Sequence, residues 1–522
     1  MNMGNSSRWL FLIAPAVLMV AVVAVFAVFA SSQPSVAADS TALAKVDTAL
    51  GGGKVVSVHV TGPKGKVIPV TLTGGRIVPQ IKLRPNEHVS VVAVVSRPGW
   101  IGWLAGSRDT ERLSLSTPTT SLDDQYLTLA QSAPLRLTFS HPVTTFAYGE
   151  PGSLQHRTFA APKAAVTIAR PASAGTLAVA AAPRTWETAS TTFVTWFPAG
   201  APTMAVTDPT PGRNITATTP ITLTFSKPYS QVLGGSMPKL SPDPPGTWHT
   251  IDSHKIEFKP SGYGFGLGTT ISVDLPSGVQ VVGGHASWTV PSGSSLRVNQ
   301  ILSQLGYLPV RWRSAARAVA PTVGAQLDAA VHPPAGDFSW IYGNTPGSLE
   351  AQWNPDEQTV VTQGALMAFE ENLGIFGSDP TPAQVWHDLI TAEIKDQRSS
   401  FGYTYVMVSE GSPESLNLWH NGRTVLTTPV NTGIPAAPTA TGTYPVFEHV
   451  PVTTMTGVNP DGTPYSDPGI PWVSYFNGGD ALHGFIRASY GSPQSLGCVE
   501  MPFSTAGQVY PYTPIGTLVN VE

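Results

Sequence analysis

A ten-residue pattern occurs twice in the 522-residue chain and constrains the fold more than any other feature. Residues 133–142 read APLRLTFSHP and residues 219–228 read TPITLTFSKP. Apolar and polar residues alternate in both copies, which places the apolar side chains on one face of a β-strand. A Thr-Trp pair follows each copy, at residues 185–186 and 247–248. The repeat therefore predicts two copies of one β unit.

The composition is that of a turn-rich β protein. The sequence contains 50 glycines and 49 prolines, and charged residues make up 12% of it. An average protein has about 12% Gly plus Pro and about 25% charged residues, so this chain is rich in turns and poor in surface helices. The net charge is −4, and no long basic cluster occurs, which argues against nucleic acid as a partner. We expect a mainly β, multidomain protein.

Two regions resemble tandem bacterial Ig-like β-sandwiches. Valine-rich alternation at Val55–Val60 and Val91–Val95, next to turn residues, adds strands to those of the repeat. A fold alone proves no activity, so a spacer is the simplest role for these regions, and ligand binding is the alternative. The boundaries that we expect are 45–200 for the first region, which is one domain or two sub-units of residues 45–118 and 119–200, and 203–295 for the second.

After Pro291 the apolar spacing becomes helical. Apolar side chains recur at helical spacing, three or four positions apart, in residues 296–305 and 359–373. A third short helix is expected around Trp386. This succession of short helices resembles a peptidoglycan-binding three-helix module. We therefore expect such a module at residues 296–398.

A long insertion interrupts that helical module. It runs over residues 313–357, which is longer than most connections between neighbouring elements. Trp340, Tyr342 and Trp353 lie in it. These aromatic side chains would stack on sugar rings, although packing in a core or between domains is the commoner fate of Trp and Tyr.

The last quarter of the chain is predicted to be a compact β domain. Tyr403, Tyr405 and Met407 alternate with other residues, which is typical of a half-buried strand. Asn421 and Gly422 separate two alternating segments, and this dipeptide favours a tight hairpin turn.

Cys498 is the only cysteine of the chain, and His483 lies fifteen positions before it. A thiol attacks as its thiolate, so a nucleophilic cysteine needs a base or cation beside it. Gly491 and Pro493 would let the intervening segment turn so that the two side chains face each other. A lone cysteine is more often a small apolar filler. Gly497 favours the catalytic interpretation, because a glycine leaves the backbone amides uncovered for a developing oxyanion.

The residues around Cys498 resemble the active-site motif of the YkuD-like L,D-transpeptidase family. In that motif, His-Gly is followed by Ser/Thr-His-Gly-Cys, then a hydrophobic residue and usually Arg or Asn. Residues 483–484 and 495–500 follow this order. The resemblance continues in Asn431–Gly433, Thr439, Gly442–Tyr444 and Ile515–Val519. It implies a catalytic domain at residues 399–522.

The resemblance also implies a role for each motif residue. Cys498 would attack the carbonyl between an L-centre and the terminal D-alanine of a peptidoglycan tetrapeptide stem. His483 would act as the general base and then as the acid, with its ring oriented by the carbonyl of Gly484. The amides of Gly497 and Cys498 would form the oxyanion hole.

Other residues of the catalytic domain are weaker candidates. Tyr444, Trp472 and Tyr475 would line the acyl-donor groove or, equally, pack in the core. Ser495 is expected to stabilise the turn before the nucleophile and is counted among the substrate-binding residues. No metal or other cofactor is expected, because histidines and carboxylates show no zinc-ligand spacing and one cysteine cannot build a thiolate cage.

Two positions depart from the family motif. Leu496 stands where most members have a second histidine, and leucine neither hydrogen-bonds nor carries a proton. His483 is then the only base of the motif. Glu500 stands where Arg or Asn is common. Its charge would oppose thiolate formation if it pointed inward and would matter little in solvent.

The N-terminal segment predicts the compartment. Trp9–Ala30 is apolar apart from Pro15 and matches the roughly 20 residues that span a bilayer. Residues 35–37 offer a small-residue cleavage site. We expect an uncleaved membrane anchor within residues 1–40, and the alternative is a signal peptide followed by secretion. Both place the remaining chain in the cell envelope, on the extracytoplasmic side.

Three functions remain open at this point. The favoured one is an anchored L,D-transpeptidase that crosslinks peptidoglycan stem peptides. Hydrolysis of the same thioester by water would make the protein an L,D-carboxypeptidase with identical residues. The third is a non-catalytic wall-binding scaffold with a decayed site, which Leu496 and Glu500 motivate. Peptidoglycan stem peptides are the partner that we expect besides the membrane, and the sequence identifies no protein partner.

Overall fold

The computed structural model describes residues 19–20, 22–27, 33–48, 53–100, 102 and 106–522. The chain divides into two compact units, residues 1–206 with 224–227 and residues 207–223 with 228–522. The finer domain boundaries predicted from the sequence stay predictions.

The predicted membrane anchor falls mostly outside the described residues. Its described part, residues 19–20 and 22–27, is helical and exposed. Within the described ranges, no helix combines the length and the hydropathy that a membrane span requires.

The first part of unit 1 consists of two antiparallel sheets around one core. Their strand orders are β1-β2-β5-β4 and β3-β6-β7. Side chains alternate along β6, where Val89, Val91, Ala93 and Val95 are buried. The two valine-rich strands predicted from the sequence are confirmed by β3 and β6. The strands are β1 (Ser35–Ala38), β2 (Ala44–Asp47), β3 (Lys54–Thr61), β4 (Val70–Thr73), β5 (Arg76–Pro79), β6 (His88–Ser96) and β7 (Arg108–Ser116).

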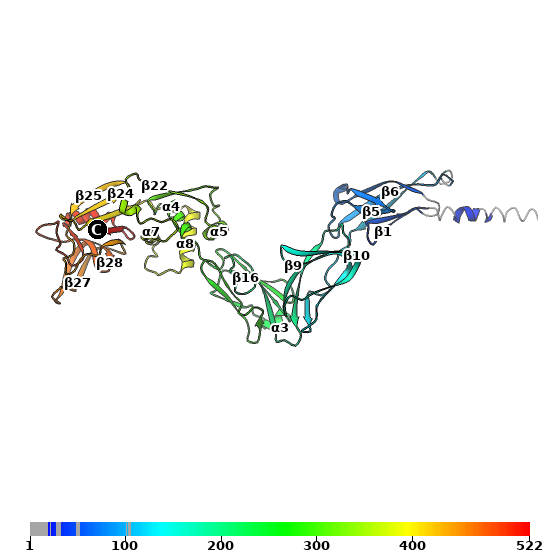
Figure 1. Ribbon diagram of the computed structural model, residues 1–522, viewed down its shortest axis with the longest axis horizontal. Coiled ribbons are helices and arrows are strands. Elements are labelled where there is room, and N and C mark those ends of the chain that lie inside the picture. Colours follow the sequence, from blue (N-terminus) through cyan, green and yellow to red (C-terminus); the bar gives the residue numbers. More distant parts are fainter. Residues whose placement is uncertain (1–18, 21, 28–32, 49–52, 101, 103–105) are drawn as a thin grey trace, which may run out of the picture. The chain divides into compact units, whose positions relative to one another are not determined.

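The second part of unit 1 is a sheet with two long strands (Figure 1). Its order is β10-β9-β11-β12-β8, and β8 pairs in parallel with β12. Leu135, Leu137 and Phe139 of the repeat are buried on one face of β9, so the predicted strand is confirmed. The strands are β8 (Tyr126–Leu129), β9 (Leu135–Glu150), β10 (Ser153–Ile168), β11 (Gly175–Ala182) and β12 (Ser190–Pro198).

The second copy of the repeat also forms a strand. Ile221, Leu223 and Phe225 of β14 are fully buried. In unit 2, β16 pairs antiparallel with β17, and β15, β18 and β20 form a small sheet. The elements of this region are β13 (Met204–Asp208), β14 (Ile221–Phe225), α3 (Tyr229–Leu233), β15 (Lys239–Ser241), β16 (Gly246–Thr250), β17 (Lys255–Pro260), β18 (Thr270–Asp274), β19 (Gln280–Val281) and β20 (Ser287–Thr289).

The two Thr-Trp pairs of the repeat do not occupy equivalent places. Trp186 follows β11, packs in the core of the first two sheets and donates its indole N–H to the carbonyl of Thr41. Trp248 lies on β16, where its ring contacts Phe258 of β17. The repeat therefore predicts the strands that carry it correctly, but its similarity does not extend to the tryptophans.

The predicted helical module contains more structure than three helices. The three predicted helices are confirmed as α4, α7 and α8. The segment treated as an insertion holds two further helices and the strand β22, which pairs with β21 at the start of the segment. The elements are α4 (Ser295–Gln304), β21 (Val310–Ser314), α5 (Val323–Val331), β22 (Gly336–Trp340), α6 (Gly347–Glu350), α7 (Val360–Asn372) and α8 (Pro382–Lys395).

The C-terminal part of unit 2 is built from two sheets. The first has the order β25-β24-β23-β31-β26 and the second the order β27-β28-β29-β30. Asn421 and Gly422 both have positive φ, as the predicted hairpin turn between β24 and β25 requires. The elements are β23 (Thr404–Ser409), β24 (Ser415–His420), β25 (Arg423–Pro429), β26 (Gly442–Pro445), β27 (Glu448–Val458), β28 (Pro464–Asn477), β29 (Asp480–Gly484), β30 (Val499–Met501), α9 (Phe503–Val509), η2 (Tyr510–Tyr512) and β31 (Leu518–Val521).

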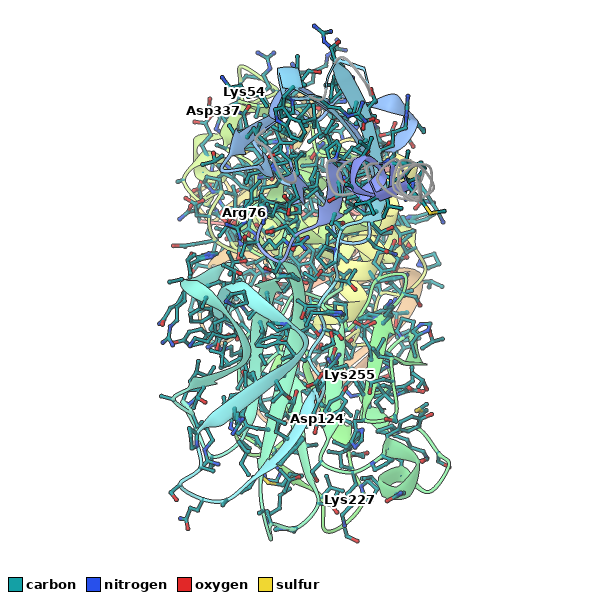
Figure 2. All side chains as sticks on the ribbon, turned by 90° about the vertical axis from the view of Figure 1, so that its right-hand side faces the viewer. Lys54, Arg76, Asp124, Lys227, Lys255 and Asp337 are labelled. Carbon is teal, nitrogen blue, oxygen red and sulfur yellow. The ribbon has the colours of Figure 1, made fainter. Side chains whose placement is uncertain are left out.

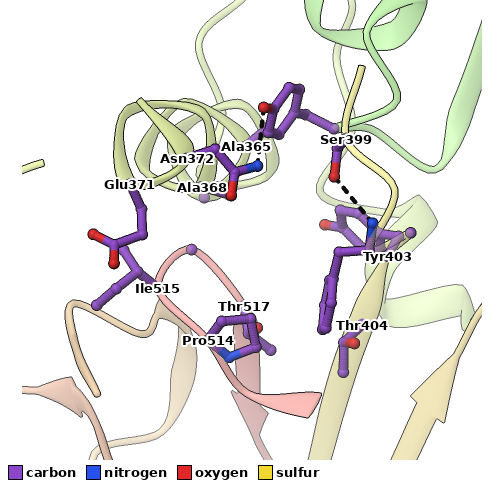
Figure 3. Close-up of a pocket in the computed structure, with 15 residues that line it drawn as sticks. Ala365, Ala368, Glu371, Asn372, Ser399, Tyr403, Thr404, Pro514, Ile515 and Thr517 are labelled. Carbon is purple, nitrogen blue, oxygen red and sulfur yellow. Dashed lines mark hydrogen bonds between the residues drawn. The ribbon is translucent and has the colours of Figure 1, made fainter. Parts of the chain in front are cut away.

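Helix α7 packs directly against this C-terminal part. Gly364 of α7 meets the backbone of Gly516, and a Cβ at either position would collide with the other residue's carbonyl oxygen. Beside this contact lies a pocket of about 70 Å³. Figure 3 shows Asn372 of α7 and the loop at Pro514 on opposite sides of the pocket. Neither Cys498 nor His483 lines it.

Charged side chains mostly lie on the surface, and Lys54, Arg76 and Asp124, which are labelled in Figure 2, are exposed. The exceptions have polar partners. Arg297 is 1% exposed and donates to the side chain of Gln326. Another exception, Glu500, belongs to the region around Cys498.

Candidate active site

Cys498 and His483 lie on one face of a parallel strand pair. β29 pairs with β30, with Leu482 opposite Val499 and His483 opposite Glu500. Side chains alternate along a strand, and Leu482 and Val499 point into the domain core. Cys498, directly before β30, and His483 therefore point to the other face.

The loop that connects these strands is held by the stretch that begins at Asn431. Parallel strands need a connection that runs back along the pair, and residues 485–498 provide it. Gly491 has a φ of 111° and donates its N–H to the Asn431 side chain at 3.0 Å. The carbonyl of Thr432 accepts the N–H of Ser495 at 2.9 Å. These bonds fix the approach of the loop to Cys498.

His483 is held as a neutral imidazole with a defined tautomer. The side chain is 2% exposed, and its Nδ1 lies 3.0 Å from the carbonyl oxygen of Gly484. A carbonyl only accepts, so Nδ1 carries the proton and Nε2 is the basic nitrogen. Burial lowers the pKa of His483. The imidazole is therefore ready to take a proton from a neighbouring group.

Cys498 is half-buried and rests as a thiol. Its Sγ lies 3.6 Å from the carbonyl oxygen of Gly479. Burial raises the pKa of the thiol to about 12, although the N–H of Ala481 favours the thiolate. At neutral pH the proton must consequently leave during the attack, so a base is required.

Ser495 closes the turn before Cys498. Its hydroxyl is buried, donates to the carbonyl of Cys498 at 2.5 Å and accepts the N–H of Gly497 at 3.2 Å. The hydroxyl thus makes the turn contacts expected from the sequence, and a contact of Ser495 with substrate stays a prediction. The amide of Gly497 can serve an oxyanion only after its bond to Ser495 opens.

The charge of Glu500 is held by Arg487. The guanidinium binds both carboxylate oxygens, with Nε at 2.7 Å and a terminal nitrogen at 2.8 Å. It also lies over the ring of Phe485, 4.6 Å from the centroid. The carboxylate of Glu500 is thus neither exposed to solvent nor left without a partner beside the sulfur of Cys498. Arg487 pairs with the charge that the sequence led us to treat as a possible defect, although Glu500, like Asp480, still raises the pKa of Cys498.

Tyr475 is the predicted groove residue that the structure places beside Cys498. The two pack in one apolar cluster with Ile470 and Val473. Burial and the neighbouring Cys498 raise the pKa of Tyr475, and they do the same for Tyr465 on the same strand. Tyr465 was not predicted, because no motif marks it and its proximity arises from the β27–β28 hairpin.

Trp472 and Tyr444 do not share that position. Trp472 lies against Gly507 of α9 and contacts Tyr510, with centroids 5.4 Å apart. Helix α9 covers the core face of β29, which is the face opposite to His483. Tyr444 belongs to the other sheet and packs against Phe476. These contacts favour the packing alternative for both residues, and their place in the acyl-donor groove stays a prediction.

His449 also lies on the α9 side of the sheet. Its burial predicts that the folding stability of the protein falls at acidic pH. Its ring stacks on Tyr510 at 3.7 Å, and burial lowers its pKa from 6.5 to about 4. Between these two values the unfolded chain binds more protons, so stability falls as the pH drops through this window. We expect His449→Phe to lose less stability than the wild type between roughly pH 7 and pH 4, measured by urea unfolding. Equal losses in both proteins would contradict this assignment.

Asp480 is a further carboxylate near the nucleophile that no motif marks. It is half-buried at the start of β29, and burial raises its pKa. Its negative charge disfavours the Cys498 thiolate. Asp480 lies three positions before His483, so a search of the sequence for acidic residues near His483 would have found it.

Comparison with known proteins finds similarity to one family. Residues 403–521 match the model of the YkuD L,D-transpeptidase catalytic domain. Among solved structures, the catalytic domain of an E. faecium L,D-transpeptidase is 26% identical, with 24% of this chain and 100% of that chain covered and a TM-score of 0.22. An L,D-transpeptidase from Mycobacterium smegmatis is 12% identical over 62% of this chain and 100% of that one, with a TM-score of 0.21. Among curated protein sequences, none matches this chain.

The motif, the strand pair that carries it and the family match define one class of domain. Residues 403–521 are a YkuD L,D-transpeptidase catalytic domain.

Proposed function

We propose that this protein is a cell-wall L,D-transpeptidase with Cys498 as its nucleophile. The observation that carries the proposal is the placement of a neutral, oriented imidazole and the chain's only thiol on one face of β29 and β30. The substrate would be the tetrapeptide stem of peptidoglycan, as the family resemblance implies.

The first half-reaction releases D-alanine. Nε2 of His483 takes the thiol proton while Sγ attacks the carbonyl carbon next to the terminal D-alanine. The C–N bond breaks, and the imidazolium returns the proton to the leaving amine. The product is a thioester on Cys498. The amide of Cys498, joined by that of Gly497 once it leaves Ser495, would stabilise the oxyanion.

The second half-reaction transfers the acyl group. An amine from a neighbouring stem attacks the thioester, a C–N bond forms and the C–S bond breaks. His483 carries a proton from the amine to the leaving sulfur. Water in place of the amine would give the carboxypeptidase reaction with the same residues.

The rest of the chain would hold this domain in the cell envelope. The apolar segment Trp9–Ala30 supports an anchored or exported protein with its catalytic domain on the extracytoplasmic side. The two β regions would act as Ig-like spacers and the helical region as a peptidoglycan-binding module. Exposure of the full-length protein to added protease on intact cells tests this placement, and protection of the catalytic domain would contradict it.

Incubation with a disaccharide tetrapeptide tests the activity. We expect a crosslinked dimer and one released D-alanine per crosslink, measured by mass spectrometry, with no product from Cys498→Ala. Tripeptide without dimer would assign the carboxypeptidase reaction. The absence of both products would favour the scaffold.

A further inference from the structure

Asp480 places a carboxylate against the backbone of the nucleophile turn. One oxygen, Oδ2, accepts the N–H of Ala440 at 3.1 Å and the side-chain amide of Asn477 at 3.4 Å. The other oxygen, Oδ1, faces Gly497, where any Cβ would collide with it. Gly497 has a φ of 117°, so both its conformation and this contact require glycine. The carboxylate therefore lies against the residue that directly precedes Cys498.

The negative charge of Asp480 has no cationic partner among the described residues. Glu500, the other carboxylate next to the nucleophile, is bound by Arg487 on both oxygens. The ion pairs of the described chain include none with Asp480, whose hydrogen bonds come from neutral amides. A half-exposed, unneutralised carboxylate in this place attracts a cation.

That arrangement hinders the first half-reaction. A carboxylate beside a thiol opposes its ionisation, and Asp480 acts on Cys498 in this direction. Its benefit must therefore lie in another step. The step that brings a cation to the site is the second one, because a primary amine is an ammonium ion at neutral pH.

We infer that Asp480 binds the ammonium group of the acceptor beside the Cys498 thioester and so favours transfer to a cationic amine over hydrolysis. This inference rests on the proposed transpeptidase function and assigns acceptor selection to one residue. The acceptor class is a primary amine that carries its charge when it enters the site.

The proton balance of the transfer is consistent with this role. An ammonium nitrogen loses two protons when it becomes the amide nitrogen of the product. One proton passes through His483 to the sulfur, which leaves as the thiol when the C–S bond breaks. The second passes to the carboxylate of Asp480 and from there to water. Burial raises the pKa of Asp480, which suits a temporary proton acceptor.

A comparison of two acceptor nucleophiles separates the binding of a positive charge by Asp480 from the acyl-transfer reaction itself. Glycinamide is mainly cationic at neutral pH, whereas hydroxylamine is neutral. With the tetrapeptide as donor, Asp480→Asn should raise the KM for glycinamide on the order of tenfold, the effect of losing a charge-assisted hydrogen bond. Transfer to hydroxylamine and the rate of D-alanine release should not fall. The share of hydrolysis in the presence of glycinamide should rise.

Matched variants keep the test decisive. Asp379→Asn removes the same charge at an exposed turn of the helical region, where φ is 50° and asparagine is well tolerated, and it should behave as the wild type. Asp480→Ser should reproduce the glycinamide defect, because it also removes the carboxylate. An unchanged KM for glycinamide in both Asp480 variants would overturn the inference while the proposed function stands. Equal loss with both nucleophiles would also overturn it, since Asp480 would then be structural. A wild type that never forms the thioester would overturn the proposed function itself.

Discussion

Replacing His483 by alanine is expected to slow the acylation of Cys498 by a carbapenem by on the order of 10² to 10⁴. Burial keeps the thiol of Cys498 protonated, with a pKa of about 12, so without the imidazole only a minute fraction reacts as thiolate. Intact mass measured over time gives the rate of adduct formation. The pH dependence sharpens the test. In His483→Ala the rate should rise about tenfold per pH unit through the alkaline range, because the thiolate fraction does so below the pKa.

The matched control is Cys498→Ala, which should form no adduct at any pH. A second control is His449→Phe, since His449 lies on the α9 side of the sheet and should leave the acylation rate unchanged. If His483→Ala is acylated as fast as the wild type, the thiol is activated by another group, and the assignment of His483 as the base is wrong.

Replacing Arg487 by methionine is expected to destabilise the protein by about 2 to 4 kcal/mol. Glu500 is 5% exposed and would lose both guanidinium bonds. Removing one partner of a buried pair costs about 3 to 5 kcal/mol, and Arg487 is 29% exposed, which places the effect toward the lower end. Urea unfolding monitored by tryptophan fluorescence provides the measurement. Carbapenem acylation should slow as well, because the unpaired carboxylate faces the side of Cys498.

The double variant Arg487→Met with Glu500→Leu is the control for this prediction. Exchanging both charged groups for apolar ones leaves no buried carboxylate without a partner, so most of the lost stability should return. A double variant that is less stable than Arg487→Met would show that the pair contributes through packing on Phe485 rather than through charge.

Local patterns predicted the elements well. The alternation in residues 135–139 and 221–225 and the helical spacing around Phe369 depend on neighbours along the chain, and the structure has strands and a helix there. The segment 313–357 was misjudged, since its helices and strands are too short for a clear periodicity. Trp186 and Trp248 show a further limit, because equal dipeptides ended in different surroundings.

The motif of the candidate site could be recognised in the sequence, although His483 and Cys498 are fifteen positions apart. Cys498, His483 and Gly484 come together through one strand pair. The contacts that the sequence did not predict are those set by register and by loops. Which face of β28 carries Trp472 depends on its packing against α9, and the partner of Glu500 lies thirteen residues away in a loop. No pattern of apolar and polar residues encodes such contacts.

The backbone contact between Gly364 and Gly516 has a practical consequence for anyone who wishes to produce the protein in pieces. A fragment cut at residue 403 would leave the loop at Gly516 facing water, together with apolar side chains that Met367 of α7 now shields. A shortened protein that starts before Ser295 keeps this covering and is the better choice for crystallisation or inhibitor screening.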